Sequence, residues 1–468
     1  MAAGPLLPTE PVATFDEYVR TGPGGRGVER AVELGPAGTI EEIARSGLRG
    51  RGGGGFPTGR KWAGVAGQPG THRYVVCNAA EGEPGTFKDR ALIRANPYQL
   101  VEGVVIAAYA VGAVEAFICL KESFGPERDR IARAVAELQD AGICRDCGVR
   151  IVAGPDEYLF GEEKAMLEVI EGNEPLPRLL PPYEHGLFAT APQTGWQAKD
   201  PEPGHHGRHE SNPTLVNNAE TLSNVPHILV DGADRFRSRG TSESPGTLVA
   251  TVVGDVLAPG VGEVDLGTPL RDVIDAVCGG VRPDRTIKAV FSGVANPVVT
   301  AEHLDAPFSY EGLAAIGSGL GAGGLIVYDD TACMVEVARM FSRFLYVESC
   351  GQCPPCKLGS GEITARLEQL EGGSGSTDDL EEIGAWLAKV TDGSRCYLAV
   401  EEQQVVGSIL RAFPDEVVEH IERRSCPRPR RLPLPKVVDL ADGLVVYDVD
   451  HWRKRPDWTY APEQAGPP

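Results

Sequence analysis

The chain has 468 residues, of which 42% are hydrophobic and 24% are charged, and its formal net charge is −21. These values are ordinary for a globular protein of two or three domains. The acidic balance argues against binding to nucleic acid or to anionic lipid, because few cations are available to neutralise phosphates. No apolar run approaches the roughly 20 residues of a membrane span, and the first residues lack the pattern of a secretory signal. We therefore expect a cytoplasmic protein.

The first part of the chain alternates between predicted helices and strands. Residues 39–46 (TIEEIARS) predict a short helix with Thr39 as its N-cap, and a glycine-rich loop follows over 47–59. Compact apolar runs predict strands at 73–78, 115–120 and 149–153. Helical periodicity predicts helices at 97–111, 127–141 and 162–171. Strands that alternate with helices predict an α/β first domain.

From residue 175 the composition and the hydrophobic pattern of the sequence change. Residues 175–214 are rich in Pro, Gly and His without a period, which predicts a long ordered loop. From residue 246, a strand, a helix and a strand in succession predict a small β-rich insert. An amphipathic helix over 331–344 then opens a helical region. Near the end of the chain, apolar residues on both sides of Asp442-Gly443 predict a hairpin.

A cluster of cysteines carries the clearest chemical signal. The chain has 11 cysteines and no secretory signal, which favours a metal site over a disulfide framework. The segment ESCGQCPPCK holds Cys350, Cys353 and Cys356 in C-x2-C-x2-C spacing. This spacing lets three thiolates converge on one inorganic core, with a fourth supplied from elsewhere. Cys396, in DGSRCYLA, is the candidate fourth ligand, and the set predicts a [4Fe-4S] cluster.

Other interpretations of the cysteines remain open. A structural zinc site also uses thiolates, although zinc sites usually pair two C-x2-C units. Cys144 and Cys147 form a separate C-x2-C without evident further ligands, so two unrelated thiols are the simpler interpretation. Apolar surroundings predict core positions for Cys77, Cys119, Cys278 and Cys333.

The glycine loop RGRGGGGFPTGRK is a candidate ligand site. Gly50, Gly52 and Gly55 match G-x-G-x-x-G, but the loop follows a helix and not a strand, so the Rossmann context fails. Glycines still allow a ligand to approach the backbone closely. Phe56 is placed to stack on a ring and Lys61 to meet a phosphate. The alternative is a flexible surface loop.

Carboxylates form a second candidate set. Glu81 and Glu83 follow a predicted strand, and ligands of α/β domains gather at the carboxyl ends of strands. Solvated surface carboxylates are the alternative. Glu162 and Glu163 open a predicted helix whose amides can receive an anion. Amide and hydroxyl groups suited to a ribityl chain or a phosphate come from Asn217, Asn218 and Thr221. Solvent-exposed positions, not metal ligation, are expected for His205, His206 and His209.

Several of these segments together resemble the flavin subunit of respiratory complex I, the 51-kDa or F-type subunit. They are SGLRGRGGGGFPTGRKW, NAAEGEPGTFKDR, FGEEKAMLEVIEG, NPTLVNNAETL, SGLGAGGLIV and ESCGQCPPCK, and the resemblance covers roughly residues 14–426. It implies an α/β fold with a non-Rossmann flavin- and NADH-binding domain, a β-grasp (ubiquitin-like, SLBB-type) insert and a C-terminal helical bundle that carries the iron–sulfur cluster. The domains are expected at 1–245, 246–330 and 331–426, followed by a Pro-rich extension at 427–468.

The resemblance also implies which residues contact the cofactors. FMN would contact Gly50, Gly52, Lys61, Asn78, Gly161, Glu162, Asn217, Asn218 and Thr221. NADH would use Gly52, Phe56, Glu81, Glu83, Tyr158, Glu163 and Tyr183. The glycine motif adds Gly55 to the cofactor-binding set. The candidate catalytic residues are Glu83 and Glu163. The cluster ligands would be Cys350, Cys353, Cys356 and Cys396.

The implied function is that of an NADH dehydrogenase subunit. Hydride would pass from NADH to FMN, and single electrons would pass to the [4Fe-4S] cluster and on to a partner, with quinone as the distal acceptor. The implied partners are a thioredoxin-like [2Fe-2S] (24-kDa, E-type) subunit and a larger iron–sulfur (G-type) subunit. Through them the protein would lie at the inner face of the cell membrane without inserting into it.

A few positions depart from the family pattern. The family has Asp where this chain has Ala80, Thr in place of Lys164, Lys in place of Leu180, and Phe in place of Tyr183. The first three motivate an alternative function, a non-catalytic or NADH-independent electron-transfer or assembly subunit of a hydrogenase- or dehydrogenase-type complex. A flavin absorbance that bleaches with NADH would support the enzyme, and brown protein without flavin would support the alternative.

Overall fold

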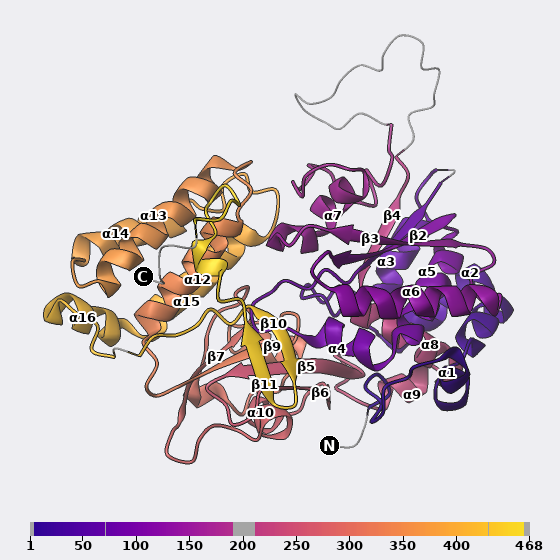
Figure 1. Ribbon diagram of the computed structural model, residues 1–468, viewed down its shortest axis with the longest axis horizontal. Coiled ribbons are helices and arrows are strands. Elements are labelled where there is room, and N and C mark those ends of the chain that lie inside the picture. Colours follow the sequence, from indigo (N-terminus) through magenta and orange to yellow (C-terminus); the bar gives the residue numbers. More distant parts are fainter. Residues whose placement is uncertain (1–3, 71, 191–210, 429, 463–468) are drawn as a thin grey trace, which may run out of the picture.

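The computed structural model describes residues 4–70, 72–190, 211–428 and 430–462. The first half of the chain forms an α/β body, the middle forms a second sheet, and the last third forms a group of helices (Figure 1). In this view the helices lie at the left, the α/β body at the right and the second sheet below. The predicted combination of an α/β fold with a helical C-terminal region is thereby confirmed. His205, His206 and His209 lie outside the described residues.

The first sheet has four parallel strands in the order β3-β2-β1-β4. They are β1 (Tyr74–Asn78), β2 (Glu115–Lys121), β3 (Gly148–Gly154) and β4 (Thr214–Asn218). Because β1 and β4 run parallel in register, Asn78 lies opposite Asn218 where both strands end. The carboxyl edge of the sheet thus brings together two segments that are far apart in the sequence.

Helices cover this sheet. The central helix α5 (Pro97–Val111) begins at the N-cap Asn96, ends at the left-handed Gly112, and packs against α2, α6 and α8. Because neighbours surround it, α5 is buried along nearly its whole length, which explains why its sequence is apolar on most faces. The helices of this body are α1 (Phe15–Thr21), α2 (Arg26–Ser46), α3 (Thr58–Ala66), α4 (Lys88–Ala95), α5, α6 (Gly125–Asp140), the 3-10 turn η1 (Tyr158–Gly161), α7 (Glu163–Ile170), α8 (Ala219–Asp231) and α9 (Ala233–Arg237).

The predicted short helix at 39–46 is wrong in its start. The helix α2 begins at Arg26 and kinks at Gly35, where φ is 72° and ψ is 167°. Thr39 is therefore a buried interior residue and not an N-cap, and its hydroxyl donates to the carbonyl oxygens of Ala31 and Gly35 at 3.1 and 2.9 Å. The sequence Gly35-Pro36 imitates a helix boundary, but here it marks a kink.

The second sheet has five strands in the order β6-β5-β9-β7-β8. Its strands are β5 (Thr247–Gly254), β6 (Gly260–Asp265), β7 (Ile287–Ser292), β8 (Val299–Thr300) and β9 (Gly324–Asp329), and its helical segments are α10 (Leu270–Cys278), η2 (Ala301–His303) and α11 (Tyr310–Ala315). β5 and β9 pair in parallel, the other pairs are antiparallel, and α10 packs on β5 and β6. The assignment of this region as a β-grasp insert, and the domain boundaries at 245, 330 and 426, stay predictions.

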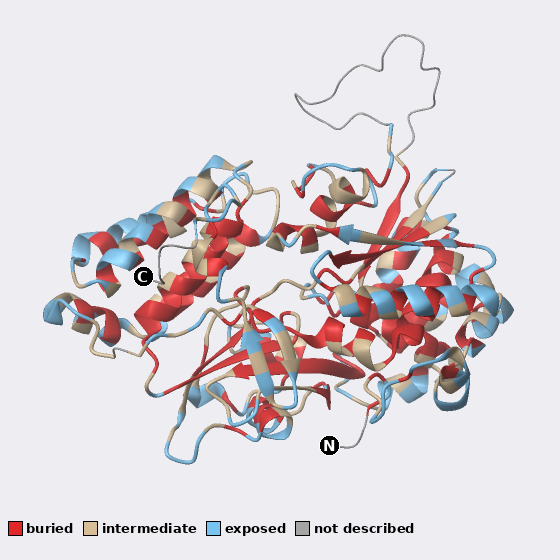
Figure 2. Ribbon diagram, viewed as in Figure 1, coloured by how far each residue is buried: buried red, intermediate tan, exposed pale blue. Residues whose placement is uncertain are grey.

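The helical group is built around α12. Its members are α12 (Met334–Glu348), α13 (Pro354–Glu371), α14 (Thr377–Leu387), α15 (Leu398–Ala412) and α16 (Pro414–Arg423). α12 packs against α13 and α15 and is buried over most of its length, whereas α14 and α16 expose their outer faces (Figure 2). α12 therefore forms the core of this group and ends just before the predicted cluster loop.

The C-terminal tail forms the predicted hairpin and folds back onto the rest of the chain. β10 (Val437–Ala441) and β11 (Leu444–Tyr447) join through Asp442 and Gly443, whose φ values are 52° and 73°. The tail continues through η3 (His451–Arg453). Gly85 donates its amide to the Pro435 carbonyl oxygen at 2.7 Å. The tail is thus in contact with the loop that follows β1.

Candidate iron–sulfur and nucleotide site

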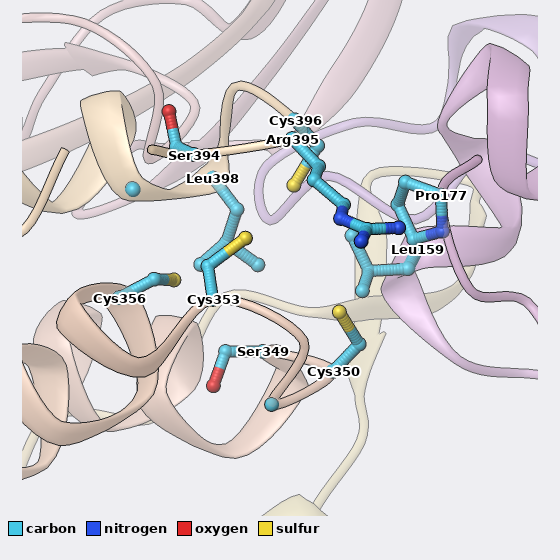
Figure 3. A pocket seen from close by; sticks show the side chains of 12 residues that line it. Leu159, Pro177, Ser349, Cys350, Cys353, Cys356, Ser394, Arg395, Cys396 and Leu398 are labelled. Atoms are coloured by element: carbon cyan, nitrogen blue, oxygen red, sulfur yellow. The ribbon is translucent and has the colours of Figure 1, made fainter. Parts of the chain in front are cut away.

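Four cysteines of the helical group surround one pocket (Figure 3). Cys350 and Cys353 lie on the loop after α12, Cys356 lies in the first turn of α13, and Cys396 lies shortly before α15. In Figure 3 the four sulfur atoms point toward a common space. Apolar parts of the lining come from Leu159, Leu398 and Ala399. The structure thus brings together all four predicted cluster ligands.

Two prolines explain the shape of this loop. Pro354 and Pro355 occupy the first positions of α13, where the missing amide hydrogen is not needed and the fixed φ favours a helix. The helix therefore starts directly after Cys353, and its first turn carries Cys356. A flexible loop at this position would have to order itself before it could present three thiols together.

The donor set fits a [4Fe-4S] cluster, because cluster iron takes cysteine thiolates as ligands. The four cysteines are free thiols. Burial raises the pKa of Cys356 to about 12 and raises the pKa of Cys396 further. The thiolate form at these positions therefore depends on the positive charge of bound metal.

Polar contacts connect the cluster loops to α7. Gln352 directs its amide Nε2 toward Cys350 Sγ at 3.7 Å and accepts a hydrogen bond from Arg395 Nη1 at 2.9 Å. Lys164 of α7 donates through Nζ to the carbonyl oxygen of Arg395, the residue before Cys396. Lys164, which departs from the family pattern, thus ties the start of α7 to the loop of the fourth ligand.

The glycine loop is anchored and leaves several amides unpaired. Arg51 is fully buried and donates to the carbonyl oxygens of Pro245 and Thr247, each at 3.1 Å. Within the part of the chain that the structure describes, the amides of residues 52–54 have no hydrogen-bond partner. A Cβ atom at Gly54 would meet nothing within 4 Å. Open space and free amides fit an anionic or flat ligand such as FMN.

Gly55 serves the shape of the loop. Its φ is +59°, and a Cβ atom there would lie 2.4 Å from the ring of Tyr310. The Tyr310 hydroxyl donates to the Gly50 carbonyl oxygen at 2.5 Å. Only glycine allows this approach of Tyr310, which belongs to the second sheet region. The contact of Gly55 with a cofactor stays a prediction.

The asparagines at the strand ends make protein contacts. Asn78 Nδ2 donates to the Gly161 carbonyl oxygen at 2.7 Å and so joins β1 to η1. Asn217 Oδ1 accepts a hydrogen bond from the indole of Trp62 at 2.8 Å. These two side chains hold the ends of the strands in place.

Asn218 and Thr221 pack directly against the glycine loop. Asn218 caps α8 by accepting the Glu220 amide at 3.0 Å, and a Cβ atom at Gly52 would lie 3.1 Å from Asn218 Cβ. Thr221 is fully buried and its hydroxyl accepts the Arg51 amide at 2.8 Å. The predicted FMN residues on β4 and α8 therefore lie directly against the glycine loop.

The start of α7 faces the same region. Glu162 caps its own helix by accepting the amides of Lys164 and Ala165, both at 2.9 Å, so these amides are already paired. Burial raises the pKa of Glu162 to about 7. Glu163 forms an ion pair with Lys61 at 2.8 Å, and their side chains are 39% and 29% exposed. Lys61 is therefore partly exposed to solvent and is paired with the Glu163 carboxylate.

Glu81 and Glu83 occupy different environments. Glu81 is buried in an ion pair with Arg90 at 3.0 Å, which makes it a support for the loop after β1. Glu83 accepts the Val294 amide at 2.6 Å and the hydroxyl of Tyr158. Tyr158 also reaches Glu401 of α15 at 3.2 Å.

Burial governs the ionisation of the group formed by Glu83, Tyr158 and Glu401. It raises the pKa of all three, and the nearness of the two carboxyl groups raises that of Glu401 further. Two carboxylates and one phenol in a buried contact cannot all be charged, so the group retains protons at neutral pH. Glu401 was not predicted as a site residue.

The remaining predicted residues lie at the surface or in the core. Phe56 and Tyr183 are 50% and 43% exposed, as suits rings that stack on a ligand entering from solvent. Ala80 is 1% exposed and packs in an apolar cluster that includes Phe160 and Leu167. An alanine at position 80 therefore suits its surroundings, which are apolar. Leu180 is half-buried.

The tail completes the surroundings of the cluster loop. Glu348, two residues before Cys350, is fully buried and is paired with His451 and Lys454 of the tail, each at 2.9 Å. Burial opposes the charge of Glu348, but the hydrogen bond from His451 and the charge of Lys454 outweigh it and hold its pKa well below the usual range. Lys454 Nζ contacts both carboxyl oxygens.

The tail also lines a cavity of about 250 Å³ next to the predicted NADH residues. On one side lie Glu81, Glu83 and the buried Lys121, whose pKa burial lowers to about 7. The hairpin supplies the opposite wall through Lys436, Val437, Val438 and Asp448. Sequence patterns do not signal these contacts, because the partners are separated by hundreds of residues.

A more open cavity of about 400 Å³ joins the two candidate sites. Glu162, Glu163 and Lys164 line one side of it. Arg395, Cys396 and Tyr397 line the other side. The predicted flavin residues at the start of α7 therefore share one cavity with the fourth cluster ligand.

Two family models match the chain. Residues 43–227 match the Nuo51 FMN-binding domain, and residues 336–420 match the NADH-ubiquinone oxidoreductase-F iron-sulfur binding region. The matched ranges contain the glycine loop, α7, β4 and all four cysteines. The predicted FMN and [4Fe-4S] cofactors are thereby confirmed, and the zinc interpretation of the four cysteines loses its support.

Individual relatives agree with these models. The F 2 subunit of NADH-quinone oxidoreductase from Rhizobium meliloti is 37% identical over 418 residues, which are 87% of this chain and 94% of the relative. The F subunit of the same enzyme from Streptomyces coelicolor is 38% identical over 425 residues, 88% of this chain and 89% of the relative. The HndC subunit of the NADP-reducing hydrogenase from Solidesulfovibrio fructosivorans is 32% identical over 423 residues, 88% of this chain and 82% of the relative.

A solved structure of similar fold is that of an NAD+-reducing [NiFe]-hydrogenase in the H2-reduced state. The match has a TM-score of 0.74 and 31% identity, and it covers 90% of this chain and 68% of that chain. Among the described residues, no helix has both the length and the apolar character needed to cross a membrane. On its sequence, its fold and its four-cysteine site, the chain belongs to the family of F-type flavin subunits of NADH-quinone oxidoreductases, which are flavin- and iron–sulfur-dependent components of multi-subunit complexes.

Proposed function

We propose that this NADH-oxidising subunit holds FMN between the glycine loop at 50–55, the ends of β1 and β4, and the start of α7. The observation that carries the proposal is the shared cavity, in which Glu162, Glu163 and Lys164 face Arg395 and Cys396. When bound, FMN accepts a hydride from NADH and passes the electrons singly to the [4Fe-4S] cluster. The residues at the start of α7 and the fourth cluster ligand therefore line the same cavity, and Lys164 contacts the Arg395 carbonyl oxygen across it.

The protein residues bind, orient and manage protons. The free amides of residues 52–54 are available to phosphate and ring oxygens. Lys61, which is paired with Glu163, would exchange that carboxylate for the phosphate. Glu162, with a pKa of about 7, is suited to hold or release a proton near neutral pH. Glu83 and Tyr158, both among the residues expected to contact NADH, form a buried pair that holds protons. Phe56 and Tyr183 present exposed rings to the entering nucleotide.

Further partners follow from the family. We propose that electrons leave the cluster for a thioredoxin-like [2Fe-2S] (24-kDa, E-type) subunit and a larger iron–sulfur (G-type) subunit, with quinone as the distal acceptor. In support, the relatives are subunits of NADH-quinone oxidoreductases and of hydrogenases. In the quinone-linked arrangement these partners would hold the chain at the inner face of the membrane.

Rapid mixing of the anaerobically purified protein with NADH tests the proposal. We expect the flavin absorbance to bleach first and the reduced cluster to appear afterwards in electron paramagnetic resonance spectra. Lys164→Met should leave flavin bleaching unchanged and slow cluster reduction at least about tenfold, since it releases the loop of Cys396. The matched control is Lys389→Met, at an exposed lysine of the helical group that carries the cluster loop.

Two outcomes would contradict the proposal. Protein that contains the cluster but no flavin would favour the non-catalytic electron-transfer or assembly function. Flavin that NADH does not bleach, while a chemical reductant does, would favour an NADH-independent subunit.

A further inference from the structure

A second group of metal-binding side chains lies outside the four-cysteine site. Cys333, His420 and Cys426 place their ligand atoms within 4.8 Å of one another. Cys333 is the N-cap of α12, His420 lies in the last turn of α16, and Cys426 follows that helix. Two of the three lie outside the matched iron–sulfur region at 336–420, so that match does not account for them.

The imidazole of His420 is oriented as a ligand. Its Nδ1 lies 2.7 Å from the Glu416 carbonyl oxygen, an acceptor, so Nδ1 must carry the hydrogen. Nε2 is then the unprotonated nitrogen, and it faces Cys333 Sγ at 3.3 Å. A backbone carbonyl that fixes the tautomer is the usual second partner of a metal-bound histidine.

The two thiols have suitable positions as well. Cys333 is 1% exposed and its sulfur accepts the Glu336 amide at 3.4 Å, in the first turn of α12. Burial raises the pKa of both thiols, so their thiolate forms depend on the charge of the bound ion. Cys426 is half-buried, so the site is open to solvent on one side.

We propose that Cys333, His420 and Cys426 bind a zinc ion, with water in the fourth position. Two thiolates and one imidazole are donors that zinc prefers, whereas Mg²⁺ and Ca²⁺ prefer oxygen ligands. Binding releases the two thiol protons, and the two thiolate charges balance the charge of the ion. Glu416 remains a neighbour that accepts the Met334 amide at 3.0 Å and pairs with Lys288.

The position of the ion suggests what it does. It joins the start of α12, the end of α16 and Cys426, the residue directly before the tail. The same tail carries His451 and Lys454 to Glu348 beside the cluster loop. The zinc ion would fix the direction in which the tail leaves the helical group.

Metal analysis of the full-length protein after anaerobic purification tests the proposal. We expect about one zinc ion per chain in addition to the iron and acid-labile sulfide of the cluster. Cys426→Ser and His420→Gln should lose at least about tenfold in zinc affinity and keep their iron and sulfide. Cys278→Ser is the matched control, because Cys278 is a buried cysteine of α10 whose thiol donates to the Ile274 carbonyl oxygen.

X-ray absorption at the zinc edge of the unmutated protein gives a test that does not depend on the folding of variants. We expect two sulfur neighbours at about 2.3 Å and at least one nitrogen at about 2.0 Å. Four sulfur neighbours would place the zinc in the cluster site and overturn the proposal. Protein without zinc after dialysis against zinc, or with a Cys333–Cys426 disulfide in anaerobic preparations, would also overturn it.

Discussion

The four-cysteine site and the flavin region are neighbours, but their polar atoms are in different states. The cysteine sulfurs face a common space as free thiols. In the flavin region, most predicted side chains already have protein partners: Asn78 with Gly161, Asn217 with Trp62, and Lys61 with Glu163. Among the described residues, the amides of residues 52–54 stay free.

The difference shows two ways of building a cofactor site. A cluster is held by bonds to side chains, so the sequence must supply particular residues at a particular spacing. A flavin phosphate or ring can be held by backbone amides, so side chains nearby are free to stabilise the fold. Substitutions such as Ala80 are then compatible with flavin binding, because the backbone does not change with them.

The largest expected effect comes from breaking the cysteine site. Cys353→Ser should remove the iron and acid-labile sulfide of the cluster, because the loop then lacks its central ligand. Flavin should stay bound, since the residues that line the pocket around Cys353 include none of the glycine loop. Iron, sulfide and flavin per chain are the measurements. Cys144→Ser, in the other C-x2-C pair, should keep all three, and a loss of iron there would show that spacing alone misled the assignment.

The next effect concerns the buried charge beside the cysteine loop. Lys454→Met leaves the buried Glu348 carboxylate with its hydrogen bonds to His451 and to the Tyr158 amide but without the ammonium group. We expect the free energy of unfolding to fall by about 3 kcal/mol. Urea denaturation followed by circular dichroism measures it. Adding Glu348→Gln should restore most of the loss, because no buried charge then remains unpaired.

The control for that change is Arg453→Met. Arg453 pairs with Asp450, whose side chain is 63% exposed, and donates two hydrogen bonds to the Ala461 carbonyl oxygen. Its replacement leaves no buried carboxylate unpaired, so we expect a smaller change of about 1–2 kcal/mol. Equal losses in both variants would mean that the tail acts through general packing and not through the charge of Lys454.

A side chain added to the glycine loop should weaken FMN binding, with a smaller change in free energy than the loss of Lys454. Gly52→Val places a branched side chain against Asn218, where even a Cβ atom would lie 3.1 Å away. We expect FMN affinity to fall about hundredfold, or about 2.7 kcal/mol, with the cluster unchanged. Gly54→Ala is the matched control, because nothing lies within 4 Å of its Cβ position. Fluorescence of released flavin measures the affinity.

The pH dependence of stability should show the weakest effect, and it comes from Glu162 in the flavin region. The pKa of Glu162 is about 7 in the folded state, against an ordinary value of 4.5, so the folded protein binds more protons between these values. Stability should therefore fall as pH rises through this window. The Glu162 side chain is 20% exposed, so solvent screens part of the effect. We expect the free energy of unfolding to fall by about 1–2 kcal/mol across this window.

Thermal unfolding of apoprotein between pH 5 and about 7.5 checks this dependence. Glu162→Gln should flatten the fall, since the amide still caps α7 and does not titrate. A variant with the same slope as the unmutated protein would show that Glu162 is not the group responsible.

The sequence predicted local features well. The helix α5 matches its predicted bounds, because Asn96, Pro97 and Gly112 mark both ends. The cysteine loop was found because its three thiols lie within a few residues, and the hairpin because Asp442-Gly443 adopts positive φ. Each of these signals lies inside the segment that it describes.

Features that depend on distant parts of the chain were not predicted. β4 and β9 were missed as strands, since β4 directly follows the Pro- and Gly-rich segment predicted as a loop and β9 follows a glycine-rich run. Glu401 joins Tyr158 across 243 residues of sequence, and Lys454 joins Glu348 across 106. Cys333 was expected to be an ordinary core residue, because nothing near it in the sequence points to His420.

The pairing of Glu348 with the tail also sets an order of events during synthesis. A chain made from its N-terminus cannot offer His451 or Lys454 to Glu348 until both have left the ribosome. All four cysteines emerge before then, while the Glu348 carboxylate still lacks His451 and Lys454 and remains hydrated. The release of His451 and Lys454 would thus decide when the cluster loop can close, and insertion of iron and sulfide would follow it.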